Sequence, residues 1–185
     1  MPEKELRKTA DVNSSFRFST YISKMKGEAK ENTALHMSES LISAGGSLIA
    51  MTIISLLAVT LGYPMALGPV GASCLLVFVA HSSPFSQPRQ VIGGHVISTF
   101  AALLIWDIFG RTHLTIGVTI AVVILLMLLS NTMHPPAAAS AIVALNSGVG
   151  WGIFLTIALS ACLVVLSSVA YNNLFHNRHY PKRWL

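Results

Sequence analysis

The sequence predicts an all-α protein that crosses a membrane several times. Of its 185 residues, 53% are apolar and 10% are charged, whereas a soluble domain carries roughly 25% charged residues. The charges gather at the two ends, and between residues 40 and 175 the only formal charges are Arg89, Asp107 and Arg111. Apolar runs of helical length fill the space between. We expect six hydrophobic segments in two three-segment pseudo-repeats, two of them short proline-broken helices, with four spans plus two re-entrant helices as the alternative.

The polar ends predict the orientation of the chain. Residues 1–38 form a polar segment, and residues 176–185 form a basic tail. Within the first segment, the composition of residues 14–30 fits either a basic surface helix or a disordered tail. Lys and Arg next to membrane spans stay on the cytoplasmic side. We therefore expect both termini in the cytoplasm, an even number of crossings and a multi-pass protein of the cell (inner) membrane. The polar start also argues against a signal peptide.

The apolar runs divide residues 39–175, the predicted transmembrane domain, in order. They cover residues 41–61, 69–80, 90–109, 114–129, 136–145 and 151–170. About 20 apolar residues span the hydrocarbon core, so the second and fifth runs are short for a crossing. Gly45 and Gly46 give the first run a small-residue face for close helix contact. Segments rich in Gly, Pro, Ser or Asn separate the runs, which indicates loops.

Each short run opens with a proline break, over residues 67–73 and 133–140. Proline suits the first turn of a helix and interrupts what precedes it. A helix that begins in apolar surroundings leaves N–H groups unpaired, and this positive end attracts anions. Pro69 and Pro136 are 67 residues apart, as are Ser73 and Ser140. Such matching interrupted segments point to the binding site of a transporter.

Three stretches, 68–73, 83–95 and 134–136, resemble the HPP family of membrane proteins, named for its His-Pro-Pro triplet. The resemblance covers about residues 40–175. It implies four membrane spans, which differs from the six segments counted above. Plant members are implicated in moving nitrite across the plastid envelope, so the resemblance also implies a nitrite-transport function. Ala137 and the alanine after it stand where the family often has glycine, which bears on how closely a solute can approach this backbone.

Arg89 and His134 are the leading candidates for chemistry. The planar guanidinium of Arg89 suits oxyanions such as nitrite or nitrate, with anchoring of loop carbonyls as the alternative. His134 precedes two prolines, which force it out of helical conformation; it would donate to an anion, carry a proton, or bond a freed carbonyl. Asp107 and Arg111 have the spacing of a helical ion pair. The predicted substrate-binding residues are Gly68, Pro69, Gly71, Ser73, Gln87, Arg89, Gly93, Gly94, His95, Asn131, His134, Pro135, Pro136 and Ser140.

These residues predict a channel or secondary transporter for a small inorganic anion, nitrite first. The expected partners are that anion and the lipid bilayer, with a homo-oligomer left open, and nucleic acid is not expected. No cofactor or metal is predicted, because His81, His95 and His134 lack ligand spacing. The alternatives are an intramembrane enzyme or a metal-binding membrane protein. An enzyme is not predicted, because Asp107 is the only acid between the first and last runs and no Ser–His spacing stands out.

Overall fold

The structure, a computed structural model, describes residue 25 and residues 36–148 and 150–184. The chain divides into two units, residues 1–35 and 36–185, and the helices belong to the second. The surface helix predicted over residues 14–30 lies outside the described residues, apart from residue 25.

The described residues form six α-helices and two 3₁₀ turns, with no strand among them. They are α3 (Met37–Thr60), η1 (Pro64–Ala66), α4 (Leu67–Val79), η2 (Pro84–Ser86), α5 (Pro88–Phe109), α6 (His113–Leu129), α7 (Pro135–Ser147) and α8 (Gly152–Asn172). The all-α prediction is confirmed, and the helix bounds lie within a few residues of the apolar runs. Three helices, α3, α5 and α8, are long and apolar enough to cross a membrane. Helices α4 and α7 have 13 residues each, which is about 20 Å of helix.

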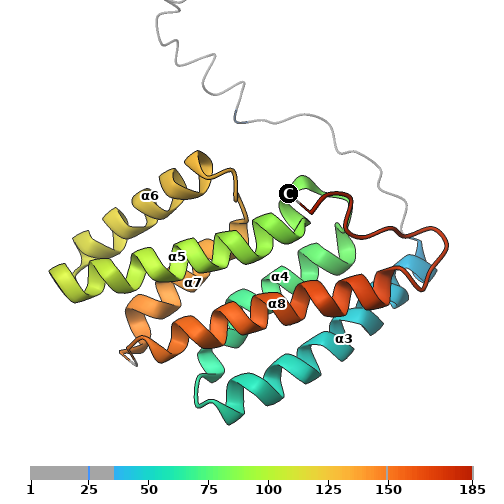
Figure 1. Ribbon diagram of the computed structural model, residues 1–185, viewed down its shortest axis with the longest axis horizontal. Coiled ribbons are helices and arrows are strands. Elements are labelled where there is room, and N and C mark those ends of the chain that lie inside the picture. The colour runs from blue at the N-terminus through green and yellow to red at the C-terminus, as the bar shows by residue number, and fades with distance from the viewer. Residues whose placement is uncertain (1–24, 26–35, 149, 185) are drawn as a thin grey trace, which may run out of the picture. The chain divides into compact units, whose positions relative to one another are not determined.

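Successive helices of this unit run in opposite directions (Figure 1). At one end, Arg178, which follows α8, binds Glu39 in the first turn of α3 at 2.7 Å. At the other end, Trp151, directly before α8, donates its Nε1–H to Asp107 near the end of α5 at 2.9 Å. The start of α3 and the end of α8 therefore lie at the same end of the helix bundle.

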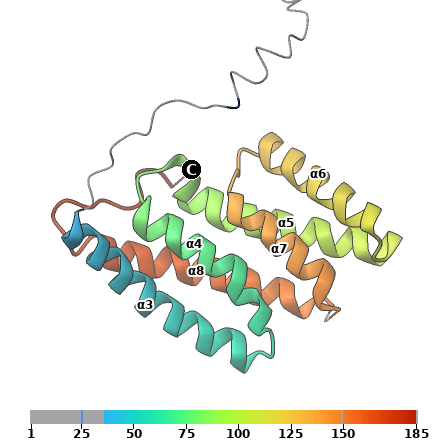
Figure 2. The ribbon, with the colours of Figure 1, turned by 180° about the vertical axis from the view of Figure 1, so that it is seen from behind.

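Helices α4 and α7 lie side by side near the middle of the bundle and run antiparallel (Figure 2). Helix α4 also packs against α3 and α8, while α5 packs against α6, α7 and α8. Many large apolar side chains point outward, among them Leu48, Leu56, Leu114, Leu129 and Leu166. An apolar exterior that surrounds buried polar groups is the arrangement that a lipid environment requires.

The glycines of α3 allow two other helices to come close. A Cβ atom added at Gly46 would lie 2.5 Å from Cδ1 of Phe78 on α4 and 2.7 Å from Cδ1 of Tyr171 on α8. Both distances are shorter than carbon atoms tolerate. The close contact predicted for this small-residue face is confirmed.

The predicted pair between Asp107 and Arg111 is not formed. Helix α5 ends at Phe109 because Gly110 adopts a φ of 67°, which turns the chain out of the helix before Arg111. Asp107 instead accepts the hydrogen bond from Trp151. Within the described part of the chain, the ion pair found is the one between Arg178 and Glu39.

The segment after α8 folds back onto the connection between α4 and α5 (Figure 1). Tyr180 is fully buried, and its hydroxyl donates to the carbonyl of Ser86 at 2.8 Å. The backbone N–H groups of Lys182 and Arg183 donate to Oε1 of Gln87 at 2.7 and 3.2 Å. This basic segment is therefore anchored to the helical unit at Tyr180 and through the backbone of Lys182 and Arg183.

Candidate functional site

Four of the predicted site residues meet in the middle of the bundle, and we call them the serine–histidine cluster: Ser73, His95, His134 and Ser140. All four are fully buried. The Ser73 hydroxyl lies 2.7 Å from Nε2 of His95 and 2.9 Å from Nε2 of His134. Nδ1 of His95 lies 2.7 Å from the Ser140 hydroxyl. Nδ1 of His134 lies 2.8 Å from the carbonyl of Phe85, in η2.

The cluster forms because α5 lies directly against the break that precedes α7. A Cβ atom added at Gly94 would lie 2.8 Å from Cβ of His134 and 3.0 Å from the carbonyl of Thr132, and one at Gly93 would lie 2.7 Å from Cγ2 of Thr132. The two glycines thus permit a contact that any side chain would block. His95 follows them into the cluster, and His134 has the extended conformation expected of a residue before proline (φ −138°, ψ 101°).

The positions of the protons in the cluster follow from its partners. A carbonyl oxygen only accepts, so Nδ1 of His134 carries a proton and, in the neutral ring, Nε2 accepts from the Ser73 hydroxyl. Ser73 then accepts from Nε2–H of His95, and Nδ1 of His95 accepts from Ser140. Every hydrogen bond of the cluster therefore points the same way, from the Ser140 hydroxyl through the two imidazoles and Ser73 to the Phe85 carbonyl. The tautomers of the two rings are assigned from these partners.

The two helix starts offer few free N–H groups. Pro135 and Pro136 have none, and the N–H of Ala137 donates to the carbonyl of His134 at 2.9 Å. Helix α4 continues from η1, and the N–H of Leu67 donates to the carbonyl of Pro64. The polar atoms available at the breaks are therefore mainly those of the serine and histidine side chains.

Arg89 lies outside the cluster. Its side chain is exposed, and Nη2 donates to the carbonyl of Ser130, the residue that caps α6, at 3.0 Å. This is the carbonyl contact that the sequence left open as the alternative to an anion site. Arg89 also lines a pocket of about 270 Å³, here called the basic pocket. Its lining residues are Ser82, Pro84, Gln87, Arg89, Gln90, Asn131, Lys182, Arg183 and Trp184.

The basic pocket and the cluster are neighbours. Pro84 lines the pocket, and the next residue, Phe85, provides the carbonyl that His134 binds. Gln87 and Asn131, both predicted site residues, belong to the pocket wall. The other two predicted glycines, Gly68 and Gly71, make no close contact with the cluster. A Cβ atom added at Gly68 would meet nothing within 4 Å, and one added at Gly71 would meet only Cε of Met51, at 3.7 Å.

Further buried hydroxyl groups continue along α5 and α8, which pack against each other. Ser98 and Thr99 on α5, and Thr156 and Ser160 on α8, are all fully buried. Oγ1 of Thr99 and Oγ of Ser160 have no hydrogen-bond partner in the described structure. Because buried polar groups are normally paired, these two hydroxyls call for a water molecule or a solute. No sequence pattern marks these residues, since Ser and Thr within apolar runs are common.

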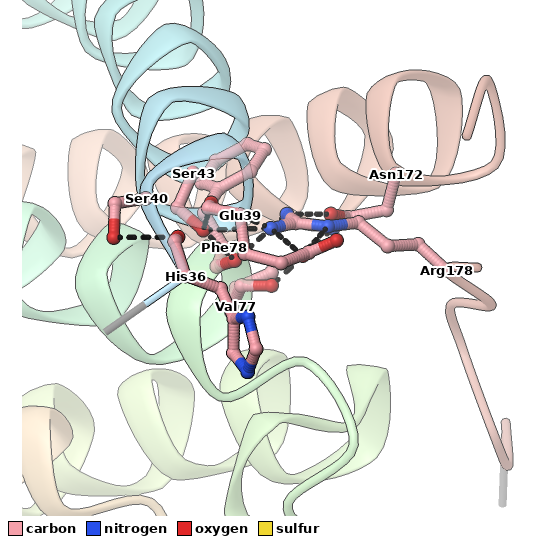
Figure 3. Close-up of polar contacts among 8 residues, drawn as sticks. All are labelled: His36, Glu39, Ser40, Ser43, Val77, Phe78, Asn172 and Arg178. Carbon is pink, nitrogen blue, oxygen red and sulfur yellow. Dashed lines mark hydrogen bonds and ion pairs between the residues drawn. The ribbon is translucent and has the colours of Figure 1, made fainter. Parts of the chain in front are cut away.

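Arg178 is a second feature that the sequence analysis missed (Figure 3). Its side chain is 2% exposed. Besides Glu39, its guanidinium donates to the carbonyl of Phe78 at 3.1 Å, to Oδ1 of Asn172 at 3.0 Å and to the hydroxyl of Ser43 at 2.9 Å. It thereby joins the start of α3 to the ends of α4 and α8. No local pattern marks it, because it stands among other basic residues and its partners are far away in sequence.

A metal centre finds no support in the described residues, which contain no group of three His, Cys, Asp or Glu side chains able to hold an ion. His95 and His134 lie with ring centroids 5.2 Å apart, but their Nε2 atoms are both occupied by Ser73.

Comparison with known proteins identifies the family. The model of the HPP transmembrane region matches residues 32–181. One transmembrane protein of Dictyostelium discoideum is 27% identical over 180 residues, covering 90% of this chain and 58% of the relative. Another from the same organism is 29% identical over 128 residues, covering 64% and 45%. The chain thus spans about half the length of these curated relatives, and no solved structure matches it. It is an integral, multi-pass membrane protein and belongs to the HPP transmembrane family.

Proposed function

We propose that this protein is a channel or secondary transporter that moves a small inorganic anion, nitrite first, across the membrane. The observation that carries the proposal is the serine–histidine cluster. Polar and ionisable side chains within a membrane are costly and usually line a pathway or a site. Here the polar side chains of both proline breaks converge on one imidazole, that of His95.

The basic pocket supplies the capture step of this proposal. Arg89, Lys182 and Arg183 bring three cationic side chains to its wall, together with the amides of Gln90 and Asn131. Cations that line a recess raise the local concentration of anions. The hydrogen bond to Ser130 holds the Arg89 guanidinium in place while its other N–H groups are available to an oxyanion.

The cluster supplies the interior part of the pathway. An anion that leaves water must receive a donor for each hydration bond it loses. Hydroxyl and imidazole groups of the cluster, followed by the unpartnered hydroxyls of Thr99 and Ser160, are suited to this role. The site residues of the proposal are therefore those of the basic pocket and the cluster, with the glycines at 93 and 94 allowing them to meet.

The helix directions support two inverted three-helix halves and six crossings. Helices α4 and α7 have equal lengths and run antiparallel, and their matching serines bind the same histidine. An even number of crossings agrees with the shared end of α3 and α8. Arg89, Lys182 and Arg183 lie at that end, so the bias of Lys and Arg supports placing it in the cytoplasm, with the cell (inner) membrane as the proposed location.

Uptake of nitrite into proteoliposomes tests the proposal. We expect wild-type protein to exceed protein-free vesicles, and Arg89→Gln to lower uptake about tenfold, which corresponds to the loss of one charge-assisted hydrogen bond of about 1.4 kcal/mol. Arg111→Gln, which removes an exposed cation at the other end, is the matched control. Wild-type uptake equal to that of empty vesicles for nitrite, nitrate, formate and chloride would refute transport.

A serine hydrolase within the membrane is the second candidate, because the Ser73 hydroxyl lies within hydrogen-bond distance of two imidazoles. A serine beside a histidine that a third group orients is the arrangement of a nucleophile and its base. Labelling with a fluorophosphonate probe decides the matter. Labelling of wild-type protein that disappears in Ser73→Ala would favour the enzyme over the transporter.

A further inference from the structure

The hydroxyl of Ser73 has three polar partners, two of which compete for its proton while both imidazoles are neutral. Besides the two imidazoles, it lies 3.1 Å from the carbonyl of Pro69, one turn earlier on α4. A hydroxyl group has one proton to donate and two lone pairs to accept with. Ser73 therefore has to choose between Nε2 of His134 and the Pro69 carbonyl as the acceptor of its single proton.

With both rings neutral, the shorter of the two acceptor distances determines where Ser73 donates its proton. Ser73 donates to His134 at 2.9 Å and accepts from His95 at 2.7 Å, while the Pro69 carbonyl goes unused by this hydroxyl. The remaining nitrogen of each ring is also bonded, to Ser140 or to the Phe85 carbonyl. No ring nitrogen of the neutral cluster lacks a partner.

The same cluster has a second, fully bonded pattern that contains one more proton. If Nε2 of His134 becomes protonated, that ring donates from both nitrogens. Ser73 then rotates its O–H toward the Pro69 carbonyl and accepts from both imidazoles with its two lone pairs. Nδ1–H of His134 keeps its bond to Phe85. The added proton thus leaves no donor or acceptor of these groups unpaired.

The surroundings of the two rings leave the added charge without a counter-ion. The other titratable or charged side chains of the helices packed around them are Cys74 on α4, Arg89 and Asp107 on α5, His113 on α6, and Cys162 and Tyr171 on α8. None of these bonds either ring in the described structure, and α7 contributes no such side chain. A cation in these apolar surroundings is costly unless an anion accompanies it.

We infer that His134 is a proton-binding site, with Ser73 as the rotating hydroxyl that admits the proton, and that one proton crosses together with one anion. This inference rests on the proposed function. A proton from water on one side forms the Nε2–H bond of His134, and release to water on the other side breaks an N–H bond of the same ring. The proton and the anion then neutralise each other where the membrane is dry, so the step moves no net charge.

Simultaneous measurement of anion uptake and internal pH in proteoliposomes tests the coupling. We expect wild-type uptake of nitrite or nitrate to acidify the lumen by one proton per anion, beyond protein-free vesicles, and to be indifferent to a potassium–valinomycin potential. In His134→Gln, which keeps the size and a hydrogen-bonding amide, residual uptake should no longer acidify the lumen and should follow the potential. Ser73→Ala should behave likewise, Ser73→Thr should restore coupling, and Thr52→Ala on the exposed face of α3 should match wild type.

The outcomes separate the two proposals. Wild-type uptake that follows the potential and leaves the internal pH unchanged overturns the proton site but not transport. If no anion is taken up, transport fails, and ¹⁵N NMR of histidine-labelled protein in nanodiscs still decides the proton site. A His134 ring that takes up a second proton on acidification in wild type, but at a different pH in Ser73→Ala, supports it. A ring that stays neutral throughout, or titrates identically in both proteins, overturns it.

Discussion

Gly94 determines how closely α5 can approach the segment before α7. We expect Gly94→Ala to destabilise the protein by about 1–3 kcal/mol, because the new methyl group would lie 2.8 Å from Cβ of His134 and 3.0 Å from the backbone carbonyl of Thr132. Thermal unfolding in detergent measures the effect. Gly68→Ala, in open space on α4, is the control and should unfold at or slightly above the wild-type temperature. Equal unfolding temperatures for the two variants would contradict this account.

The residues of the cluster were predictable because polar side chains at breaks in apolar runs are unusual. Ser73, His95, His134 and Ser140 were all among the predicted residues, and the structure joins them through hydrogen bonds. Their common role as an anion site stays a prediction. Which atoms pair was not predictable, because spacing along the chain does not determine how antiparallel helices meet.

At the same scale, the environment of Arg89 differs from the one expected of an anion ligand at membrane depth. Arg89 is exposed and binds the carbonyl of Ser130, whereas Arg178 is buried. Burial of an arginine depends on carbonyls at two helix ends, and no single stretch of sequence contains that information.

At the scale of elements, the side chain of Gln87 joins the connection between α4 and α5 to the tail. Gln87 donates Nε2–H to the carbonyls of His81 and Ser83, at 3.1 and 2.8 Å, and its Oε1 accepts from the tail. We expect Gln87→Ala to release residues 180–184 and increase their cleavage by trypsin at Lys182 several-fold. Limited proteolysis followed by mass spectrometry measures this, with Ser82→Ala as the control. Cleavage at the wild-type rate would show that Tyr180 alone holds the segment.

The same connection makes the packing of the tail sensitive to acid. Burial, and then the positive charges of Arg178 and Lys182, lower the pKa of His81 from its ordinary 6.5. The unfolded chain therefore binds a proton at this residue more readily than the folded one, so its contribution to stability is complete above pH 6.5 and declines as the pH falls below it. We expect unfolding temperature to fall with acidification in wild type and to fall less in His81→Gln. Parallel pH profiles for the two proteins would exclude His81 as the cause.

Helix positions were the most predictable feature at this scale. Each apolar run became one helix, because hydropathy and proline or glycine breaks act locally. The packing of the tail was not predictable. Residues 176–185 have the composition of a solvated basic end, although Tyr180 is fully buried.

At the scale of the whole molecule, Arg178 ties together three helices that are distant in sequence. We expect Arg178→Ala to destabilise the protein by about 2–4 kcal/mol, because the carbonyl of Phe78 and the amide of Asn172 lose a buried donor. Arg178→Lys should recover only part of this, since lysine cannot reach several acceptors at once. Thermal unfolding in detergent measures both, with the exposed Arg183→Ala as the control. A change no larger than that of Arg183→Ala would contradict a role for Arg178 in holding the bundle.

The alternating helix directions place the first and last described helix ends together, as an even number of crossings requires. Cysteine accessibility in inverted membrane vesicles would measure the number of crossings, with single cysteines introduced before α3 and after α5. Six crossings predict that these two positions label from opposite sides.

The course of the last described residues has a practical consequence for work on this protein. Trp184 lines the basic pocket, and the chain reaches it directly from the backbone bonds to Gln87. A fluorescent protein or affinity tag attached at this point would stand at the mouth of the pocket and obstruct it. Assays on material tagged there would then understate activity, and a cleavable tag would reveal the difference.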